Sequence, residues 1–195
     1  MSVTGCIQMT ADEGEQTSAP ILYEIQIEIV SFEMEHSLSP TVEVVSHATE
    51  ATPARVEVGL TNTGDDTLDL SFGATPPFSD HGAERVDGGA RAYLAPDSRR
   101  NFGLDHVNDD LSADENPPAP TDGCWAVEDV GHDLLAMSSQ LEPGKTISET
   151  YSVFADVEND DCLPAGTYRF EESAGGPSSD SPWVIDVIVK ESNGS

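Results

Sequence analysis

Positive charge is what this sequence has least of. Its 195 residues contain 8 Lys and Arg against 37 Asp and Glu, which gives a formal net charge of −29. A nucleic-acid binder or a basic membrane-surface helix needs clustered Lys and Arg, so both classes are excluded. Long apolar runs are also missing. The longest, at residues 183–189, is interrupted by Asp186 and falls well short of the roughly 18 residues of a transmembrane helix.

The acidic residues are spread along the whole chain, and its apolar content argues against disorder. Hydrophobic residues make up 37% of the sequence and occur in short runs, which an unfolded acidic chain lacks. A folded chain with this self-repulsion needs screening, and the Debye length falls from about 10 Å at 0.1 M salt to about 3 Å at 1 M. Because Lys145 and Lys190 are the only lysines, we predict a protein of a halophile, with an acidic protein of an ordinary source as the alternative.

The segment Val3-Thr4-Gly5-Cys6 resembles a lipobox, the tetrapeptide that precedes the lipidated cysteine of secreted lipoproteins. The resemblance implies a lipid on the thiol of Cys6. Residues 10–20 are small, polar and acidic, as in a flexible tether, so we expect a disordered N-terminal tether at residues 1–20. The five residues before Cys6 contain no charged or hydrophobic segment of a signal peptide. The alternative is an ordinary cysteine in a disordered tail.

The three cysteines are an odd number, and setting Cys6 aside leaves Cys124 and Cys162 as a pair. We predict a disulfide between them, which would indicate an oxidising, extracytoplasmic compartment. The alternative is two buried free thiols in a cytosolic protein. A zinc site is disfavoured because no C-x₂-C spacing occurs.

Alternation of apolar and polar residues predicts strands in most of the chain. Ile25, Ile27 and Ile29 alternate with polar residues, which is typical of a half-buried strand. Further strands are predicted within residues 41–46, 55–62, 67–72, 124–127, 146–155, 167–171 and 183–189. Residues 91–94 are a candidate for a short strand, and residues 133–141 fit a helix or a strand, of which we favour the strand. We expect residues 74–89 and a long acidic segment at 96–123 to be loops. The prediction is an all-β chain, an immunoglobulin-like antiparallel β-sandwich of seven to nine short strands over residues 21–191, with a disordered tail at 192–195.

The turn at residues 62–66 predicts a hairpin between residues 55–62 and 67–72. The stretch V-G-L-T-N-T-G-D-D-T-L-D-L-S-F at residues 58–72 resembles the early hairpin of BsuPI-type immunoglobulin-like domains, the family of intracellular proteinase inhibitors. The L-E-P-G turn at 141–144 and the P-A-G-T-Y motif at 164–168 also match that family. The resemblance covers about residues 55–190 and implies the fold, not the inhibitor activity. The chain as a whole also resembles uncharacterised lipoproteins of halophilic archaea.

Some residues of the sequence resemble the ligands of copper or of calcium. Cys124, His132 and Met137 resemble a blue-copper ligand set, but seven residues separate Cys124 from His132, and no motif selects a second histidine from His36, His47, His81 or His106. Two acidic clusters suggest calcium, although neither matches an EF-hand. They comprise Asp105, Asn108, Asp109, Asp110, Asp114 and Glu115, and Asp156, Glu158, Asn159, Asp160 and Asp161. We predict no metal and no cofactor, because a chain this acidic produces such clusters by composition.

We expect a non-catalytic protein. The sequence contains no G-x-S-x-G, no H-E-x-x-H and no Gly-rich phosphate loop. Trp125 and Trp183 are expected to pack in the core, and Pro76, Pro77 and Phe78 to close one end of the sandwich. The function predicted is a lipid-anchored, monomeric extracellular module that serves surface interaction or solute binding in a halophile. A cytosolic proteinase-inhibitor-like binding module and a small hydrolase without a recognisable motif are the alternatives.

The charge predicts that folding depends on salt. We expect the melting temperature of the purified chain to rise between about 0.1 and 3 M KCl, because the Debye length shrinks over this range from about 10 to about 2 Å. Thermal unfolding followed by circular dichroism measures it. A melting temperature that is independent of salt would contradict the halophilic interpretation.

Overall fold

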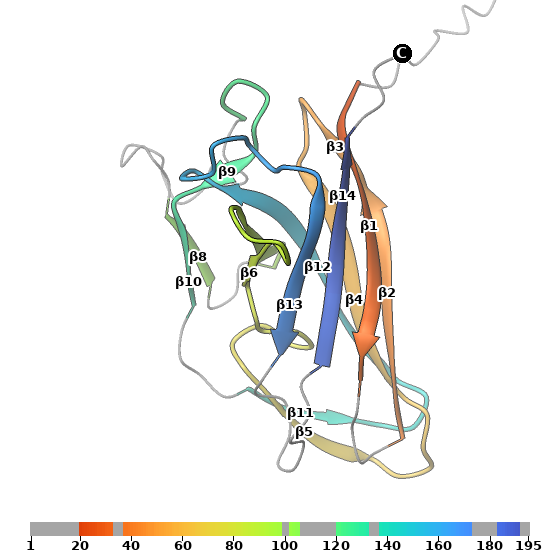
Figure 1. Cartoon of the computed structure of the whole chain (residues 1–195). Coiled ribbons are helices and arrows are strands. Elements are labelled where there is room, and N and C mark those ends of the chain that lie inside the picture. Colours follow the sequence, from red (N-terminus) through yellow and green to blue (C-terminus); the bar gives the residue numbers. More distant parts are fainter. Residues whose placement is uncertain are drawn as a thin grey trace, which may run out of the picture.

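The structure is a computed structural model that describes residues 20–32, 37–98, 102–105, 120–132, 137–172 and 183–191. The described residues form fourteen strands and no helix (Figure 1). The strands are β1 (Ile21–Ser31), β2 (Leu38–Ser46), β3 (Ala48–Thr49), β4 (Ala54–Asn62), β5 (Leu68–Phe72), β6 (Gly82–Glu84), β7 (Arg91–Pro96), β8 (Phe102–Asp105), β9 (Ala126–Val127), β10 (Asp129–His132), β11 (Met137–Leu141), β12 (Thr146–Asp156), β13 (Gly166–Glu172) and β14 (Trp183–Glu191). The all-β prediction is confirmed. The expected number of strands was too low, because short pieces such as β3 and β6 are too brief to show a period.

Two curled sheets enclose the main core. One contains four strands in the order β13-β14-β1-β3, and the other contains β2-β4-β12-β7-β6, with β9 added in parallel beside β12. The other strand pairs of both sheets are antiparallel. Two small sheets, β11-β5 and β10-β8, lie beyond them. Figure 1 shows β13, β14 and β1 in one layer and β4 and β12 in the layer behind.

The core is built from alternate residues of the facing strands. On β4, Val56, Val58 and Leu60 are fully buried, whereas Arg55 and Glu57 are only half-buried. Figure 1 shows β14 in the opposite layer, and its Ile185 and Val187 are buried in the same cluster as Val56 and Val58. Each such side chain contributes roughly 1.5–3 kcal/mol when fully removed from water. The period-2 pattern therefore determines which face of each strand turns inward.

Aromatic side chains pack together in this core, and Trp183 is buried there as the sequence predicted. Trp183 packs edge-on against Phe32 and Phe78, with ring centroids 5.4 and 5.3 Å apart. Phe78 is fully buried and follows a cis peptide bond between Pro76 and Pro77. The Tyr151 hydroxyl donates to the carbonyl oxygens of the same loop, at 3.2 Å from Thr75 and 2.6 Å from Phe78. The loop is thus fixed to the core by contacts from both layers.

The predicted hairpin between residues 55–62 and 67–72 is wrong. β4 pairs on its two sides with β2 and β12, and β5 pairs instead with β11. The buried Asn62 redirects the chain: its amide donates to the carbonyls of Asp66 and Leu141, both at 2.8 Å, and its side-chain oxygen accepts from Gly64 N at 2.9 Å. The apolar faces of β5 and β11 then form their own small cluster with Leu60.

The two segments that we expected to be long loops each contain a strand. The segment expected at 74–89 contains β6, which pairs with β7, and the acidic segment expected at 96–123 contains β8, which pairs with β10. The sequence signal for β8 is the alternation of Phe102 and Leu104 with Gly103 and Asp105. This alternation covers four residues, which is too few to identify a strand without its partner strand. The expected tether at 1–20 lies outside the described residues except for Pro20, as do the tail at 192–195 and residues 106–119.

One side of the two-sheet structure is closed by the backbone. Arg85, directly after β6, forms a bridge with Tyr168 of β13, and Val86 N donates to Thr167 O at 2.8 Å. Gly166 makes this approach possible: it has φ 152°, and a Cβ there would lie 2.6 Å from Arg85 Cδ. The edges of the two sheets therefore meet at β6 and β13.

Asn62 provides a test of the fold. We expect Asn62→Asp to lower the free energy of unfolding by about 2 kcal/mol, because it removes the donor to the buried Leu141 carbonyl and to the carbonyl of Asp66. Asp65→Asn, an exposed change in the same turn, should stay within about 0.5 kcal/mol of the parent chain. Urea unfolding of both variants at the same salt concentration measures the difference. Equal stability of the two variants would show that Asn62 does not hold this turn.

Candidate functional site

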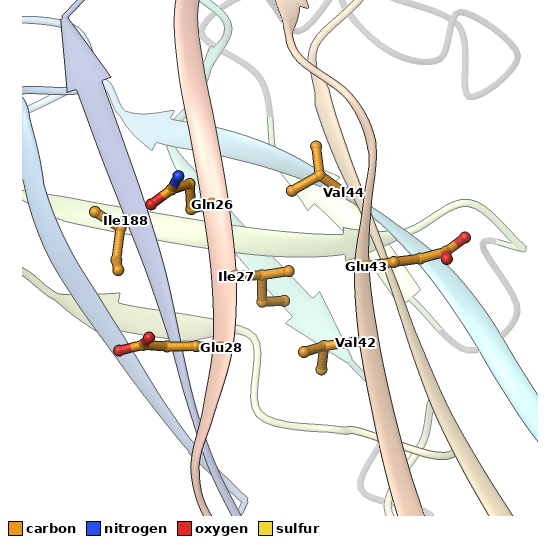
Figure 2. A pocket seen from close by; sticks show the side chains of 7 residues that line it. All are labelled: Gln26, Ile27, Glu28, Val42, Glu43, Val44 and Ile188. Atoms are coloured by element: carbon orange, nitrogen blue, oxygen red, sulfur yellow. The ribbon is translucent and has the colours of Figure 1, made fainter.

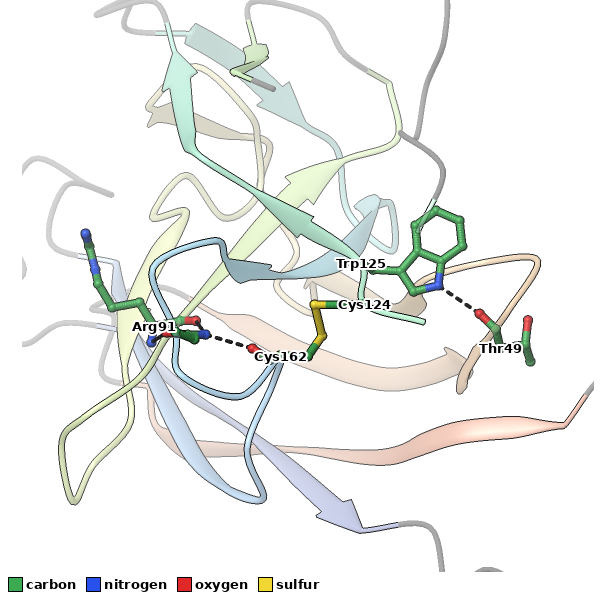
Figure 3. The surroundings of a disulfide bond; sticks show 6 residues. Thr49, Arg91, Cys124, Trp125 and Cys162 are labelled. Carbon is green, nitrogen blue, oxygen red and sulfur yellow. Dashed lines mark hydrogen bonds between the residues drawn. A yellow bond between two sulfur atoms is a disulfide. The ribbon is translucent and has the colours of Figure 1, made fainter. Parts of the chain in front are cut away.

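A disulfide joins Cys124 and Cys162, as the sequence predicted. The S–S distance is 2.07 Å and the two Cα atoms lie 5.5 Å apart, inside the range that a disulfide requires. Figure 3 shows the bond between the segment that precedes β9 and the loop that follows β12. Because the cysteines are 38 positions apart, the bond fixes two loops that the sheets themselves leave unpaired.

A tight turn presents Cys124 to its partner. Thr121 and Cys124 exchange backbone hydrogen bonds of 3.0 and 2.9 Å. Between them, Asp122 has φ 52° and Gly123 has φ 78°, the left-handed conformations that an Asp-Gly pair adopts in a two-residue turn. The next residue, Trp125, is buried and donates from Nε1 to Thr49 O at 2.8 Å (Figure 3). The turn and the indole together anchor the loop to β3.

The opposite loop is held by Asn159 and Asp156. The Asn159 amide donates to Arg91 O at 2.9 Å and to Cys162 O at 2.8 Å, and its oxygen accepts from Arg91 N at 2.8 Å. The buried Asp156 accepts from the Tyr93 hydroxyl and from Glu158 N, both at 2.8 Å. Both side chains use their polar atoms within the protein, so they act as braces of the Cys162 loop.

A pocket of about 760 Å³ opens beside the disulfide. We call it the disulfide pocket. It is lined by Leu22, Tyr23, Arg85, Asp122, Gly123, Asp161, Cys162, Leu163, Pro164, Ala165, Val189 and Lys190. The lining combines both signs of charge, with Arg85 and Lys190 as cations and Asp122 and Asp161 as anions. Its volume is within the range of about 300–1,000 Å³ usual for small-molecule sites.

One residue of the pocket wall has a buried hydroxyl without a partner in the described part of the chain. Tyr23 lines the pocket and is 8% exposed, and its hydroxyl makes no hydrogen bond within the described part of the chain. Burial, and then the neighbouring Tyr168, raise the pKa of Tyr23 well above its ordinary value. Burial also raises the pKa of Tyr168 to about 12, although Arg85 opposes this shift, and its hydroxyl donates to Pro164 O at 2.9 Å. At neutral pH both phenols are therefore uncharged donors.

Arg85 stands at the pocket with its charge partly neutralised. Its Nε lies 2.5 Å from an Asp87 carboxylate oxygen and donates to Gly88 O at 3.1 Å. Lys190, on the last strand, is exposed. The pocket lining therefore offers the cations of Arg85 and Lys190 together with the carboxylates of Asp122 and Asp161.

The other predicted ligand sets do not come together in the described residues. Cys124 is consumed by the disulfide, so no thiolate is present for copper. The described residues contain no group of three or more His, Cys, Asp or Glu able to hold a metal ion, and most of the first acidic cluster, with His36 and His106, lies outside them. Cys6 also lies outside the described residues. No helix long and apolar enough to cross a membrane occurs in the part of the chain described.

A hydroxyl–imidazole pair is present but enclosed. His81 Nε2 lies 2.8 Å from Thr75 Oγ1, and Nδ1 lies 2.9 Å from Leu94 O. Both side chains are 3% exposed, so a substrate has no path to the hydroxyl. The pair is a core hydrogen-bond chain that joins the Phe78 loop to β7.

The sequence did not reveal the disulfide pocket. Arg85 and Lys190 are 105 positions apart in the chain, and the pairing of β14 with β13 and the Arg85–Tyr168 bridge bring them to one pocket. The local signal was the Asp122-Gly123 turn beside Cys124, which identifies a loop held in place. Comparison with known proteins adds no assignment: no family model, curated protein or solved structure matches the chain.

Removing the disulfide should destabilise the fold. We expect Cys124→Ala with Cys162→Ala to lower the free energy of unfolding by up to about 4 kcal/mol, the loop-entropy value for this separation. Urea unfolding of the double variant and of Cys6→Ser, which should match the parent chain, measures it. Insensitivity of the parent chain to a reducing agent would contradict this expectation.

The buried tyrosines predict a loss of stability in alkali. Up to about pH 10 the phenols are neutral in both states. Above it the tyrosines of the unfolded chain ionise, whereas burial holds the pKa of Tyr23 and of Tyr151 higher in the folded chain, so the free energy of unfolding falls as pH rises. Tyr23→Phe should make this fall shallower and raise stability at pH 7, because it removes a buried hydroxyl that has no partner in the described part of the chain. Urea unfolding between about pH 8 and 11 measures both, and an unchanged pH profile would contradict it.

Proposed function

We propose that the chain is a non-catalytic, lipid-anchored extracellular module of a halophile that binds small solutes, built on an immunoglobulin-like β-sandwich. The Cys124–Cys162 disulfide is the observation that supports this best, because such bonds persist in oxidising compartments. The lipobox-like segment at Cys6 and the excess of acid support the anchor and the saline setting. The facing sheets and the family-like turns at residues 141–144 and 164–168 support the sandwich.

The solutes proposed are small zwitterions, of which free amino acids are the probes. A carboxylate would meet Lys190 and Arg85, whereas an ammonium group would meet Asp122 and Asp161. All four side chains belong to the disulfide pocket. Leu22, Leu163 and Val189 supply apolar surface for the body of the solute.

Thermal stability in the presence of single amino acids tests solute binding. We expect at least one to raise the melting temperature, with a stabilisation of about 2.7 kcal/mol at a concentration one hundred times its Kd. Lys190→Gln should weaken this response, and Lys145→Gln, the matched change of the other lysine at an exposed turn, should leave it unchanged. Equal responses of the two variants, or no response to any amino acid, would contradict the assignment of the pocket.

The anchor is tested in the native host. Mass spectrometry of the membrane fraction should find the Cys6 thiol carrying lipid, and Cys6→Ser should release the protein from the membrane. Titration of free thiols on protein from the same source should find Cys124 and Cys162 oxidised. Free thiols at both positions, in protein recovered from the cytosol, would favour the proteinase-inhibitor-like alternative.

A further inference from the structure

A second groove lies where two consecutive strands separate. β1 and β2 run side by side in space, yet no ladder joins them: β1 belongs to the four-stranded sheet and β2 to the larger one. A groove of about 360 Å³ remains between them (Figure 2), which we call the β1–β2 seam. It is lined by Gln26, Ile27, Glu28, Val42, Glu43, Val44 and Ile188.

The seam exposes an unused backbone edge on β1. On this side β1 pairs with β3 through Ile21 and Tyr23, and Ile25 N then donates to His47 Nδ1 at 3.2 Å. In an antiparallel pair the backbone groups of alternate residues point away from the partner. The N–H and C=O of Ile27 and Ile29 therefore point into the seam, where no described strand pairs with them.

β2 presents a matching but poorer edge. Thr63 N donates to Ser37 O at 2.7 Å at the start of the β2–β4 register, so alternation directs the backbone groups of Pro40, Val42 and Val44 away from β4. Pro40 has no N–H, and the register shifts between Val44 and Ser46. A strand that enters the seam would find its longer unbroken template on β1.

The floor of the seam is apolar and its rims are acidic. Ile27, Val42 and Val44 are half-buried and pack against the main core. Figure 2 shows these three side chains in the space between the two ribbons, with Glu28 and Glu43 directed to the outer sides. No Lys or Arg lines the seam. Such a floor accepts alternate apolar side chains of an extended segment, and such rims accept cationic side chains between them.

We propose that the β1–β2 seam binds an extended peptide by strand addition, and that the peptide alternates apolar residues with lysine or arginine. The peptide pairs with Ile27 and Ile29 of β1, places its apolar side chains over Ile27 and Val42, and directs its cations toward Glu28 and Glu43. A second copy of this chain is disfavoured as the occupant, because it would bring the same carboxylates and a further net charge of −29 to the groove. The site is separate from the disulfide pocket and does not depend on the solute proposal.

A short labelled peptide that alternates valine with lysine is the probe. We expect saturable binding to the full chain in about 1 M KCl, where the Debye length of about 3 Å leaves only contact pairs effective. A valine–glutamate peptide, and the valine–lysine peptide with N-methyl groups on every second residue, should bind at least about tenfold more weakly. Equal binding of the N-methylated peptide would overturn strand addition, as would no binding of the parent peptide.

Charge reversal at the rims tests the location. Glu28→Lys with Glu43→Lys, both exposed, should reduce affinity for the valine–lysine peptide about tenfold and give the valine–glutamate peptide the tighter binding. Glu84→Lys with Glu142→Lys makes the same change of net charge at exposed positions of β6 and the β11–β12 turn and should retain the parent preference. A switch of preference in both variants would show a general charge effect and overturn the site.

Hydrogen exchange of individual amides identifies the template. We expect the amides of Ile27 and Ile29 to exchange freely in the unbound chain and to be protected by the peptide. Peptide binding without protection at these residues would overturn the proposal. Protection of these amides in the unbound chain would also overturn it. Protection that disappears on dilution would assign the seam to a second copy, and protection that disappears on removal of residues 1–19 would assign it to the chain's own N-terminal segment.

Discussion

The backbone bridge between Arg85 and Tyr168 joins the two sheets at one edge, and the disulfide pocket depends on it. It joins β6 to β13, so the sheets are continuous on one side and separate at β1 and β2 on the other. The same bridge places Arg85 at the disulfide pocket. Gly166 is the residue that permits this contact, because any Cβ there would collide with the Arg85 stem. One close approach thus accounts for a closed edge and for a cation in the pocket.

The few cations of the chain are arranged against specific carboxylates. Each arginine of the described residues has an aspartate partner: Arg55 with Asp97, Arg85 with Asp87, Arg91 with Asp156, and Arg169 with Asp186. The Arg169 pair is bidentate, at 2.9 and 2.8 Å, on a buried aspartate. All four of these contacts in the described residues are made to aspartates. Exposed ion pairs contribute little individually, so internal pairing does not remove the need for screening that the net charge implies.

Strands were predictable where the alternation of apolar and polar residues was long. The way in which the strands pair was less predictable. The alternation of Ile25, Ile27 and Ile29 identified β1, and Val56, Val58 and Leu60 identified β4, because burial of one face imposes period 2. The partner of a strand is a different question. Residues 62–66 have the composition of a hairpin turn, yet the buried amide of Asn62 binds Leu141 O across 79 positions, and β5 joins β11. Such contacts depend on the whole fold and leave no local pattern.

The disulfide was predictable from cysteine number, but its surroundings were not. With Cys6 set aside, two cysteines were left to pair with each other. The pocket beside them is assembled from β1, β14, the residue after β6, the loop before β9 and the loop after β12. The acidic residues near Cys162 also changed meaning. In the sequence Asp156 and Asn159 belonged to a candidate calcium cluster, and in the structure their polar atoms brace the loop against Tyr93 and Arg91. A composition rich in acid hides the few carboxylates that have structural roles, because a residue's environment and not its type distinguishes them.

The two grooves are electrostatically different, and this separates their possible ligands. The disulfide pocket contains Arg85 and Lys190, two of the eight basic residues of the chain, whereas the seam is lined by carboxylates and apolar groups without a cation. At molar salt only charges in contact act, so each groove responds to the groups that line it and not to the field of the whole protein. A carboxylate on a solute is therefore attracted by the cations that line the pocket and repelled by the glutamates that line the seam. An extended cationic segment meets the opposite conditions, since the seam supplies both an unpaired β1 edge and the glutamates that flank it.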